Sequence, residues 1–322
     1  MNILITGANG FLGSWLCQLA SSIDDVKILA AVRVNANTEK LKNLSNTTIL
    51  SIDYSSKASL VEFFSQIQSE HGDIDLIIHN AGLTKSTKPD SFFQINTELT
   101  ERLVAAVKQS GVLKKGTFSY VSSQAALGPM GCHGPVSAYG ESKLAAEKVL
   151  IESDLDYLIF RPTGIYGPGD NEFLALFKTV KSGIYPCAAP INQKITLIHV
   201  HDVAKNIIEL SLTKKNQIIH LSDGTVYTHS DLKSALDSAL NKKSLMLMIP
   251  TFLIIGYLRL NQFLARLFAY EPILTVEKHG EISKDWNHDF SLERKEIPLA
   301  IKFDLQSGFA NTSKYYQSQK LL

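Results

Sequence analysis

The sequence predicts an α/β protein with a doubly wound parallel sheet, followed by a smaller, mixed and mostly helical lobe. Through about residue 160, short apolar runs alternate with longer amphipathic ones, which is the pattern of strands joined by crossover helices. The first apolar run opens directly into a glycine-rich turn. A chain of 322 residues that is 45% hydrophobic can also bury the large core that such a sheet needs.

The first strand is expected over residues 2–6 and the first helix over residues 11–20. Glycines in the turn between them let the backbone approach a pyrophosphate closely, and free N–H groups at the helix start face its negative charge. Such a turn can also be purely structural, but its place after the first strand favours a dinucleotide site. The residues predicted to bind the cofactor there are Gly7, Asn9, Gly10, Phe11, Leu12 and Gly13.

The second strand, expected over residues 26–33, ends at Arg33. Proteins that select NAD place an acidic residue near this point to bind the ribose hydroxyl. A guanidinium can instead pair with a 2′-phosphate, and Lys40 is a second candidate cation. A solvated surface arginine is the alternative, but no acidic residue follows Arg33 before Glu39. We therefore predict NADP as the cofactor, with NAD as the alternative.

Further strands are expected over residues 48–52, 74–79, 118–122 and 157–160, with helices near 57–70, 91–110 and 137–153. Ligands of such sheets bind at the carboxyl ends of the strands. Asp53 and Tyr54 follow one strand and are predicted to contact adenine. Asn80, Ala81 and Gly82 follow the next strand, where small residues leave room for a cofactor. Both groups can also be read as ordinary turn residues.

Tyr139 and Lys143 lie four residues apart on an expected helix, so they share a face and can approach one ligand together. Free tyrosine has a pKa of about 10, and an adjacent ammonium favours its phenolate. Ser123 follows a strand end, where its hydroxyl can stabilise charge on a substrate oxygen, whereas strand alternation turns Ser122 away. We predict Ser123, Tyr139 and Lys143 as catalytic residues, although a helix-surface Tyr and Lys at this spacing is common by chance.

Together, these segments resemble the extended short-chain dehydrogenase/reductase superfamily, in its NAD-dependent epimerase/dehydratase or 3β-hydroxysteroid-dehydrogenase-like branch. The segments that carry the resemblance are Thr6–Gly13, His79–Gly82, Val121–Ser123, Tyr139–Lys143, Arg161–Asp170 and His199–Ala204, with Asp285-Trp286 and Gly308-Phe309 in the tail. They are specific in combination and cover nearly the whole chain.

The resemblance implies a Rossmann domain over residues 1–165, to which the chain returns near 195–225, and a substrate lobe mainly over 166–322. It implies that Tyr139 is the acid/base, that Lys143 holds the nicotinamide ribose and that Ser123 orients the substrate. By the same resemblance, Pro162 and Ile165 line the nicotinamide, Asn96 is structural, and Asp202 caps a helix. Trp286 and the Tyr315-Tyr316 pair are expected to pack the tail, and the resemblance implies a homodimer.

The expected activity is hydride transfer between nicotinamide and a carbonyl or secondary alcohol. An epimerase that acts through a transient keto intermediate is one alternative, and a non-catalytic dinucleotide-sensing or scaffold protein is another. Gln124 and Ala125 stand where dehydratases of this class carry an acidic pair. Arg161-Pro162-Thr163 stands where sugar-nucleotide epimerases usually have an asparagine. A nucleotide-sugar substrate is therefore disfavoured.

The run Leu245–Leu258 is almost uninterrupted apolar sequence, yet it is too short to span a bilayer, which needs about 20 apolar residues. From 251 to 269, a narrow polar stripe of Arg259, Gln262 and Arg266 leaves a wide apolar face. A buried lobe helix is the favoured interpretation, ahead of a lid over an apolar substrate and a peripheral membrane anchor. A lid would indicate a lipid-like or steroid-like substrate.

Net charge is +1 and no basic stripe is present, so a small molecule is expected as the partner rather than nucleic acid. Cys17, Cys132 and Cys187 lack metal-type spacing and fit reduced thiols. With strand residues directly after Met1, we expect a cytoplasmic protein without a secretory leader.

Two further groups of polar residues are candidates for a site. His199 and His201 alternate before Asp202, but no third suitable ligand is near, and no metal is predicted. Cys132 and His133 lie in a glycine- and proline-rich loop that could border the substrate. His133 is a candidate second acid/base, against the simpler interpretation of an exposed loop histidine.

Overall fold

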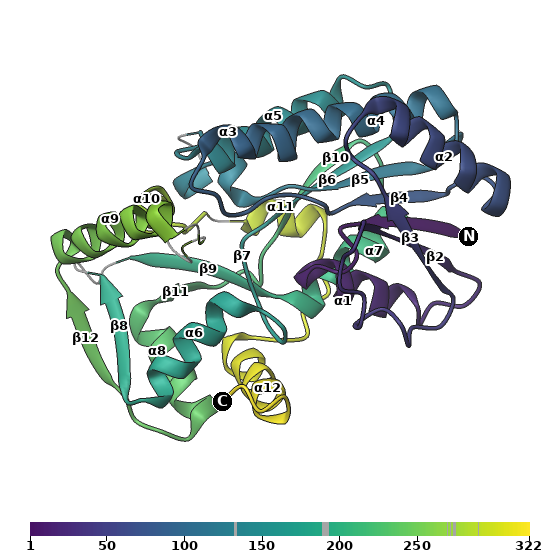
Figure 1. Ribbon diagram of the computed structural model, residues 1–322. Helices are drawn as coiled ribbons and strands as arrows, with labels where there is room; N and C mark the ends of the chain where they lie inside the picture. The colour runs from purple at the N-terminus through teal and green to yellow at the C-terminus, as the bar shows by residue number, and fades with distance from the viewer. Residues whose placement is uncertain (132–133, 189–192, 269, 271, 273–274, 289) are drawn as a thin grey trace.

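A seven-stranded parallel sheet forms the larger part of the protein, with strand order β10-β6-β5-β4-β1-β2-β3 (Figure 1). The structure, a computed structural model, describes residues 1–131, 134–188, 193–268, 270, 272, 275–288 and 290–322. The strands of this sheet are β1 (Asn2–Thr6), β2 (Lys27–Arg33), β3 (Thr47–Ile52), β4 (Leu76–His79), β5 (Thr117–Val121), β6 (Tyr157–Pro162) and β10 (Gln217–Leu221). The order reverses between β1 and β4, which is where doubly wound sheets bind ligands.

Helices cover both faces of this sheet. One face carries α2 (Lys57–His71), α4 (Leu99–Ser110) and α5 (Ala138–Ile151), and the other carries α1 (Phe11–Ala20) and α7 (Val200–Ser211) (Figure 1). The alternation of a strand decides which core a side chain joins. In β1, Leu4 packs into the α2/α4 core, while Ile3 and Ile5 pack into the α1/α7 core. The apolar strands are thus buried on both faces, as expected for a parallel sheet.

The predicted fold class is confirmed, and the predicted strands and helices of the first 160 residues are present with ends within two residues. One helix is more complex than expected. The segment near 91–110 comprises α3 (Pro89–Phe92), a π-helical turn η1 (Phe93–Glu98) and α4. A π-helical turn inserts an extra residue into a helix and is frequent at functional sites. Here it contains the buried Asn96.

The rest of the chain adds two small sheets and more helices beside the large sheet. β11 (Val226–Thr228), β9 (Lys194–His199) and β7 (Gly164–Tyr166) form one sheet, and β12 (Leu245–Ile249) pairs in parallel with β8 (Ile184–Ala188). The helices are α6 (Asn171–Lys181), α8 (His229–Leu240), α9 (Thr251–Phe268), α10 (Val276–Ile282), α11 (Ser291–Glu296) and α12 (Leu305–Ser318), with short 3₁₀ turns η2 (Gln124–Ala126) and η3 (Pro129–Gly131). A separate aromatic core that includes Phe177, Phe309 and Tyr316 holds this part together.

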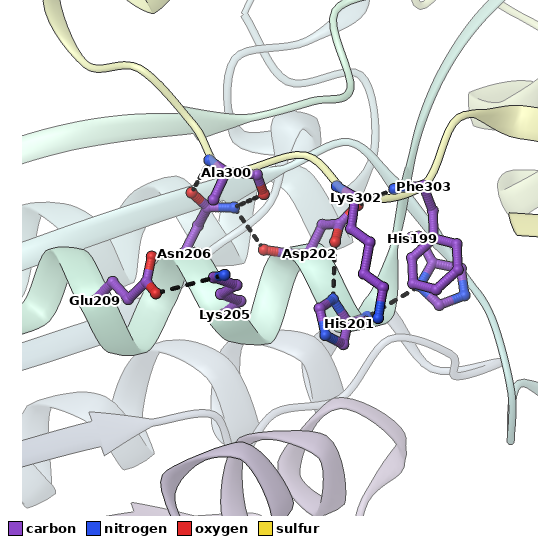
Figure 2. A network of polar contacts seen from close by, with 9 residues as sticks. All are labelled: His199, His201, Asp202, Lys205, Asn206, Glu209, Ala300, Lys302 and Phe303. Atoms are coloured by element: carbon purple, nitrogen blue, oxygen red, sulfur yellow. Dashed lines mark hydrogen bonds and ion pairs between the residues drawn. The ribbon is translucent and has the colours of Figure 1, made fainter. Parts of the chain in front are cut away.

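The role expected for Asp202 is wrong. His199 is the N-cap of α7, where its Nδ1 accepts from the backbone N–H of His201. Asp202 lies inside the first turn and is fully buried. Its Oδ2 accepts hydrogen bonds of 3.0 Å from the backbone N–H groups of Lys302 and Phe303 (Figure 2). The carboxylate therefore fastens a segment 100 residues away instead of capping its own helix.

Asn206, one turn after Asp202, holds the same segment. Its side-chain amide exchanges two hydrogen bonds of 2.9 Å with the backbone of Ala300 (Figure 2). His199 and His201 do not share a strand face, since β9 ends at His199 and His201 is helical. Among the described residues, no group of three His, Cys, Asp or Glu side chains could hold a metal ion.

Candidate active site

A cavity of about 1740 Å³ opens at the carboxyl ends of the large sheet. One wall comes from the loops after β1, β2, β4, β5 and β6, and the opposite wall comes from β8, β9, α9 and α10. The cavity therefore lies between the large sheet and the smaller part of the molecule. Its size exceeds that of a typical drug-sized pocket, about 300–1,000 Å³, and leaves room for a cofactor and a substrate together.

The glycine turn after β1 is built so that larger residues do not fit. Gly7 has a φ of +64°, and a Cβ there would lie 2.9 Å from the Cα of Ala81. A Cβ on Gly13 would lie 2.1 Å from the carbonyl oxygen of Gly7. The turn closes with a 3.0 Å hydrogen bond from the N–H of Gly10 to the carbonyl of Gly7. Because α1 starts at Phe11 and Gly10, Phe11 and Leu12 line the cavity, the N-terminus of this helix lies at the cavity, as an anion site requires.

Arg33, at the end of β2, is exposed and lines the cavity beside the glycine turn. Tyr54, after β3, also lines it. Asp53 does not, because its carboxylate turns toward Ser55 and accepts from the backbone N–H and the hydroxyl of that residue. Lys40 is also absent from the described lining; its Nζ lies close to Gly169, where a Cβ would be 3.5 Å from it.

The turn after β4 is fixed by Thr6, the last residue of β1. The Thr6 hydroxyl oxygen accepts from the N–H groups of Asn80 at 3.2 Å and Ala81 at 3.1 Å. Beneath it, the buried His79 ring contacts the hydroxyls of Thr6 and Thr100 at 2.8 and 3.1 Å. Burial, with the nearby charge of Lys143, lowers the pKa of His79 to about 3. His79 is thus a neutral structural histidine under the cofactor turn.

Asn96 connects three parts of the site. Its Oδ1 accepts from the N–H of Leu83 at 2.8 Å, and its Nδ2 donates to the Leu83 carbonyl at 3.0 Å and to the Ser142 hydroxyl at 2.9 Å. The π-helical turn places this side chain between the loop after β4 and α5. A Cβ on Gly82 would lie 3.0 Å from Asn96 Oδ1 and 3.3 Å from Lys143 Nζ, so the space there depends on glycine.

Ser123, Tyr139 and Lys143 line the same cavity. Tyr139 and Lys143 come from the first two turns of α5, whose N-cap Ser137 accepts from the N–H of Gly140. Tyr139 is half-buried, with the Phe92 ring at its edge and its own ring 5.3 Å from Lys278 Nζ. Ser123 is extended and caps the 3₁₀ turn η2 by accepting from the N–H of Ala125 at 3.1 Å.

Lys143 is buried, and its Nζ donates a 2.8 Å hydrogen bond to the carbonyl of Val121. Burial lowers the pKa of Lys143 to about 7, and the carboxylate of Glu147, one turn along α5, opposes that shift. An ammonium held at this position can therefore lose its proton near neutral pH, which makes its charge sensitive to what binds beside it.

A buried ion pair that sequence reasoning missed lies beneath the site. Arg161 Nε donates to Glu147 Oε1 at 2.9 Å, and a second guanidinium nitrogen donates to Oε2 at 2.5 Å. The Ser122 hydroxyl donates to the same carboxylate, although Ser122 also lies among the residues that line the cavity. Arg161 stands in a segment that the sequence analysis singled out, but its pairing with Glu147 across α5 and β6 has no signal in the sequence.

The far wall of the cavity is mostly apolar. Its lining residues from the smaller part of the molecule include Ile195, Leu197, Ile249, Leu253, Ile254, Tyr257 and Leu258. Among the described lining residues that follow Lys143 in the chain, Lys278 is the one Lys or Arg. Trp286, for which the sequence predicts packing of the tail, also lines the cavity. Its backbone is held by hydrogen bonds to Lys194 and Thr196 of β9.

Helix α9 is not the buried helix that the sequence favours. Leu258 and Ala265 are buried, but Phe252, Tyr257 and Phe263 are more than 60% exposed. In Figure 1, α9 lies at an outer edge of the molecule above β8 and β12. Within the described parts of the chain, no helix combines the length and apolarity needed to cross a bilayer. The helix thus forms a cavity wall on one side and an apolar surface on the other.

Comparison with known proteins identifies the family. Residues 3–221 match the family model described as NAD dependent epimerase/dehydratase family. The chain belongs to the NAD-dependent epimerase/dehydratase family. It is therefore an NAD-dependent enzyme of the extended short-chain dehydrogenase/reductase type, and the resemblance seen in its motifs is confirmed.

Two relatives of this family member have different activities in their names. A ceramide reductase of Caulobacter vibrioides is 26% identical over 98% of this chain and 94% of its own. A UDP-glucose 4-epimerase of Vibrio cholerae is also 26% identical, over 98% of this chain and 95% of its own. Sequence identity therefore does not separate a reductase from an epimerase.

Solved structures show the same fold. The UDP-glucose 4-epimerase of Thermotoga maritima, with UDP-glucose, superposes with a TM-score of 0.76 at 18% identity, covering 99% of this chain and all of that one. The UDP-glucuronic acid 4-epimerase of Bacillus cereus, in complex with NAD, has a TM-score of 0.74 at 19% identity, covering 99% of both chains.

The site of this epimerase/dehydratase family member brings most of the predicted residues together. Gly7, Asn9, Gly10, Phe11, Leu12, Arg33, Tyr54, Asn80, Ala81, Gly82, Ser123, Tyr139, Lys143, Pro162 and Ile165 all line one cavity. Gly13 and Asp53 are the two outside the described lining; Gly13 instead permits close packing of α1 on the turn. Cys132 and His133 lie outside the described residues.

The residues present fit a nicotinamide dinucleotide. The glycine turn, where a Cβ on Gly7 would collide with the backbone of Ala81, and the start of α1 suit the pyrophosphate, and Asn80, Ala81 and Gly82 line the same cavity. When bound, the nicotinamide supplies or accepts a hydride. The chain itself provides a phenol, a hydroxyl and an ammonium around the cavity, which can hold and move the proton of a reacting oxygen.

Proposed function

We propose that this enzyme is an oxidoreductase that interconverts a carbonyl and a secondary alcohol on an apolar, lipid-like substrate, and that it prefers NADP. The observation that carries the proposal is the apolar wall of the cavity opposite the large sheet, formed by residues of β8, β9, β12 and α9. Residues 166–322 then make up most of a substrate lobe. Residues 1–165, with the returning segment 195–225, make up the cofactor domain.

A nucleotide-sugar substrate would require cations for its diphosphate, since phosphates are held by Arg, Lys and backbone N–H groups. After Lys143 in the chain, the described lining supplies Lys278 alone, and its Nζ lies over the Tyr139 ring. Arg161 is engaged by Glu147. An alkyl chain, by contrast, gains about 0.8 kcal/mol for each methylene that it buries. The wall therefore favours the ceramide reductase relative over the epimerase relative.

The proposed chemistry uses three side chains. In the reductive direction the carbonyl carbon receives the hydride, the Tyr139 hydroxyl gives its proton to the carbonyl oxygen, and a secondary alcohol results. The Ser123 hydroxyl donates to the same oxygen and orients it. Lys143 holds positive charge near Tyr139, which favours the phenolate that remains. Dehydration is disfavoured because Gln124 and Ala125 provide no acid or base for a neighbouring carbon.

The test is NADPH oxidation with a series of ketones of increasing alkyl length, beside short ketones and nucleotide sugars. We expect kcat/KM to rise by about fourfold for each methylene buried, the equivalent of about 0.8 kcal/mol. Tyr139→Phe should lower kcat by at least about 100-fold and keep cofactor binding. Tyr157→Phe is the matched control, because Tyr157 packs against the core at the start of β6.

Other outcomes would assign the alternatives. Isomerisation of a nucleotide sugar without net cofactor turnover would establish an epimerase. Tight cofactor binding with no turnover of any substrate, by the parent and the Tyr139→Phe variant alike, would indicate a sensing or scaffold protein. An Ile254→Asp variant refines the test, since it should reduce kcat/KM for long ketones and spare short ones. The homodimer that the resemblance implies stays a prediction, which light scattering would test.

A further inference from the structure

Helix α9 presents a continuous apolar surface to the outside of the molecule. Phe252 is 71% exposed, Tyr257 66%, Phe263 63% and Leu267 65%. Single exposed apolar residues are normal, but a contiguous patch of large ones marks an interaction surface. We call the exposed side of α9 that contains Phe252, Leu253, Tyr257, Leu260, Phe263 and Leu267 the α9 face.

The periodicity of α9 gathers these residues on one side. At about 100° per residue, the α9 face spans an arc of roughly 140°. The buried Leu258 and Ala265 lie on the opposite side and contact the body of the molecule. The exposed Arg259 lies just beyond one edge of the arc. A helix with one apolar side open to solvent and a cation at its border has the character of a helix that lies in a membrane interface.

The neighbouring strand β12 is apolar and exposed as well. Leu245, Leu247 and Met248 are 71%, 45% and 56% exposed, and Pro250 alone separates β12 from α9. The patch also continues into the cavity, because Leu253 and Tyr257 are both exposed and part of the cavity lining. An apolar path therefore connects the outer surface with the space opposite Tyr139.

Along the segment that forms this surface, the charged side chains have one sign. Residues 241–270 contain Lys242, Lys243, Arg259 and Arg266 and neither Asp nor Glu, although the whole chain carries 32 basic and 31 acidic residues. Lys242 and Lys243 are exposed at the start of β12. Lys242 Nζ donates to the backbone carbonyl of Lys181, which brings the end of α6 to the same rim. Cations beside an apolar patch complement anionic lipid headgroups.

We propose that the α9 face and β12 dock this protein on an anionic lipid bilayer, with α9 lying in the plane of the interface. An apolar helix face in this arrangement inserts about 5–10 Å, and the lysines and Arg259 then meet the headgroups. A second copy of the chain is a poorer occupant, because a two-fold contact sets the same patch against itself and would bring like charges together. The inference concerns where the protein sits and goes beyond the proposed reaction.

The experiment is flotation with vesicles of phosphatidylglycerol and phosphatidylcholine in equal parts, compared with pure phosphatidylcholine. The parent protein should float with the anionic vesicles. A Leu260→Ser/Phe263→Ser/Leu267→Ser variant should bind at least tenfold more weakly. These three residues do not line the cavity. The matched control is Ile151→Ser/Leu212→Ser/Ile218→Ser, which removes apolar side chains that are 42%, 43% and 36% exposed elsewhere on the molecule, and it should bind like the parent.

A second measurement does not depend on loss of binding. A Phe263→Trp variant should shift its added tryptophan emission to the blue when anionic vesicles are present, and an Ile151→Trp variant should not. The Lys242→Glu/Lys243→Glu variant should float less than the parent with anionic vesicles, and this difference should be larger at low salt than at high salt. A parent that stays with the buffer, or emission from the Phe263→Trp variant that vesicles leave unchanged, overturns the proposal.

Self-association is distinguished by light scattering. If the α9 triple variant converts a dimer of the parent into a monomer while neither binds vesicles, the face joins two copies and the membrane proposal is wrong. No step of these measurements requires turnover. A failure of the proposed oxidoreductase activity would therefore leave the docking result intact, and the reverse also holds.

Discussion

The Nζ of Lys143 lies 2.8 Å from the carbonyl oxygen of Val121 and 4.7 Å from the centre of the Tyr120 ring. The lysine side chain therefore ends at the last residue of β5, which precedes Ser123 by two residues in the chain. The helix that carries the lysine, α5, also carries Tyr139. This position is nearly free of solvent, and burial is the main reason that the pKa of Lys143 falls to about 7. The charge on Lys143 is therefore present below neutral pH and fades above it.

The first prediction concerns the pH dependence of kcat/KM, which reports ionisations of the free enzyme. Because an ammonium is needed and its pKa is lowered to about 7, kcat/KM for ketone reduction should fall as pH rises through about 7. A Lys143→Arg variant keeps its charge throughout this range. Its kcat/KM should therefore not fall in this way as pH rises, even if its maximum kcat/KM is lower than that of the parent. Steady-state assays between pH 5.5 and about 9 check this. If both proteins showed the same fall in kcat/KM with rising pH, the ionisation would belong to another group.

The second prediction concerns acid stability. The folded pKa of His79 is about 3, below the ordinary value of about 6.5, so the unfolded chain binds an extra proton between these values. The free energy of unfolding should therefore fall with decreasing pH across this window, by about 1.4 kcal/mol per pH unit for this histidine. A His79→Gln variant should show a shallower slope in urea denaturation at pH 4 to about 7. Parallel slopes for parent and variant would contradict a neutral buried His79.

The third prediction concerns the buried pair of Glu147 and Arg161, whose side chains are 1% and 10% exposed. Glu147→Gln leaves the guanidinium buried without its counter-charge, and we expect a loss of about 3 kcal/mol in unfolding free energy. Glu209→Gln is the control, since Glu209 pairs with Lys205 at the surface and should change stability by less than about 1 kcal/mol. Equal effects of the two substitutions would show that burial of the pair is unimportant.

The fourth prediction concerns the cofactor. Arg33 lines the cavity and is exposed at the end of β2, where a 2′-phosphate would gain a charge-assisted hydrogen bond. Arg33→Ala should lower the ratio of kcat/KM for NADPH to that for NADH by about tenfold or more, the equivalent of about 1.5–3 kcal/mol. Lys42→Ala, at a nearby surface ion pair with Glu39, should leave the ratio unchanged. An Arg33→Ala variant with its full preference would refute the role of this arginine.

Much of the cofactor half could be predicted from the sequence because its signals are local. Gly7 stands where φ is positive, and apolar runs such as β1 are buried on both faces, so each reveals its conformation within a few residues. Tyr139 and Lys143 share a helix, and helical spacing by itself places them on one face. These residues reach one cavity because parallel strands bring their carboxyl ends to the same edge.

The sequence by itself therefore determined the fold class, the glycine turn and the Ser123, Tyr139 and Lys143 set. Only the tertiary structure decided what Asp202, Glu147, Trp286 and α9 do. Asp202 accepts a hydrogen bond from a backbone segment 100 residues away, and the Trp286 backbone is held beside the cavity by Thr196 of β9. Residues near Asp202 or Trp286 in the sequence give no sign of these distant partners. Periodicity shows that α9 has an apolar face, but whether another element covers that face depends on how the whole chain packs.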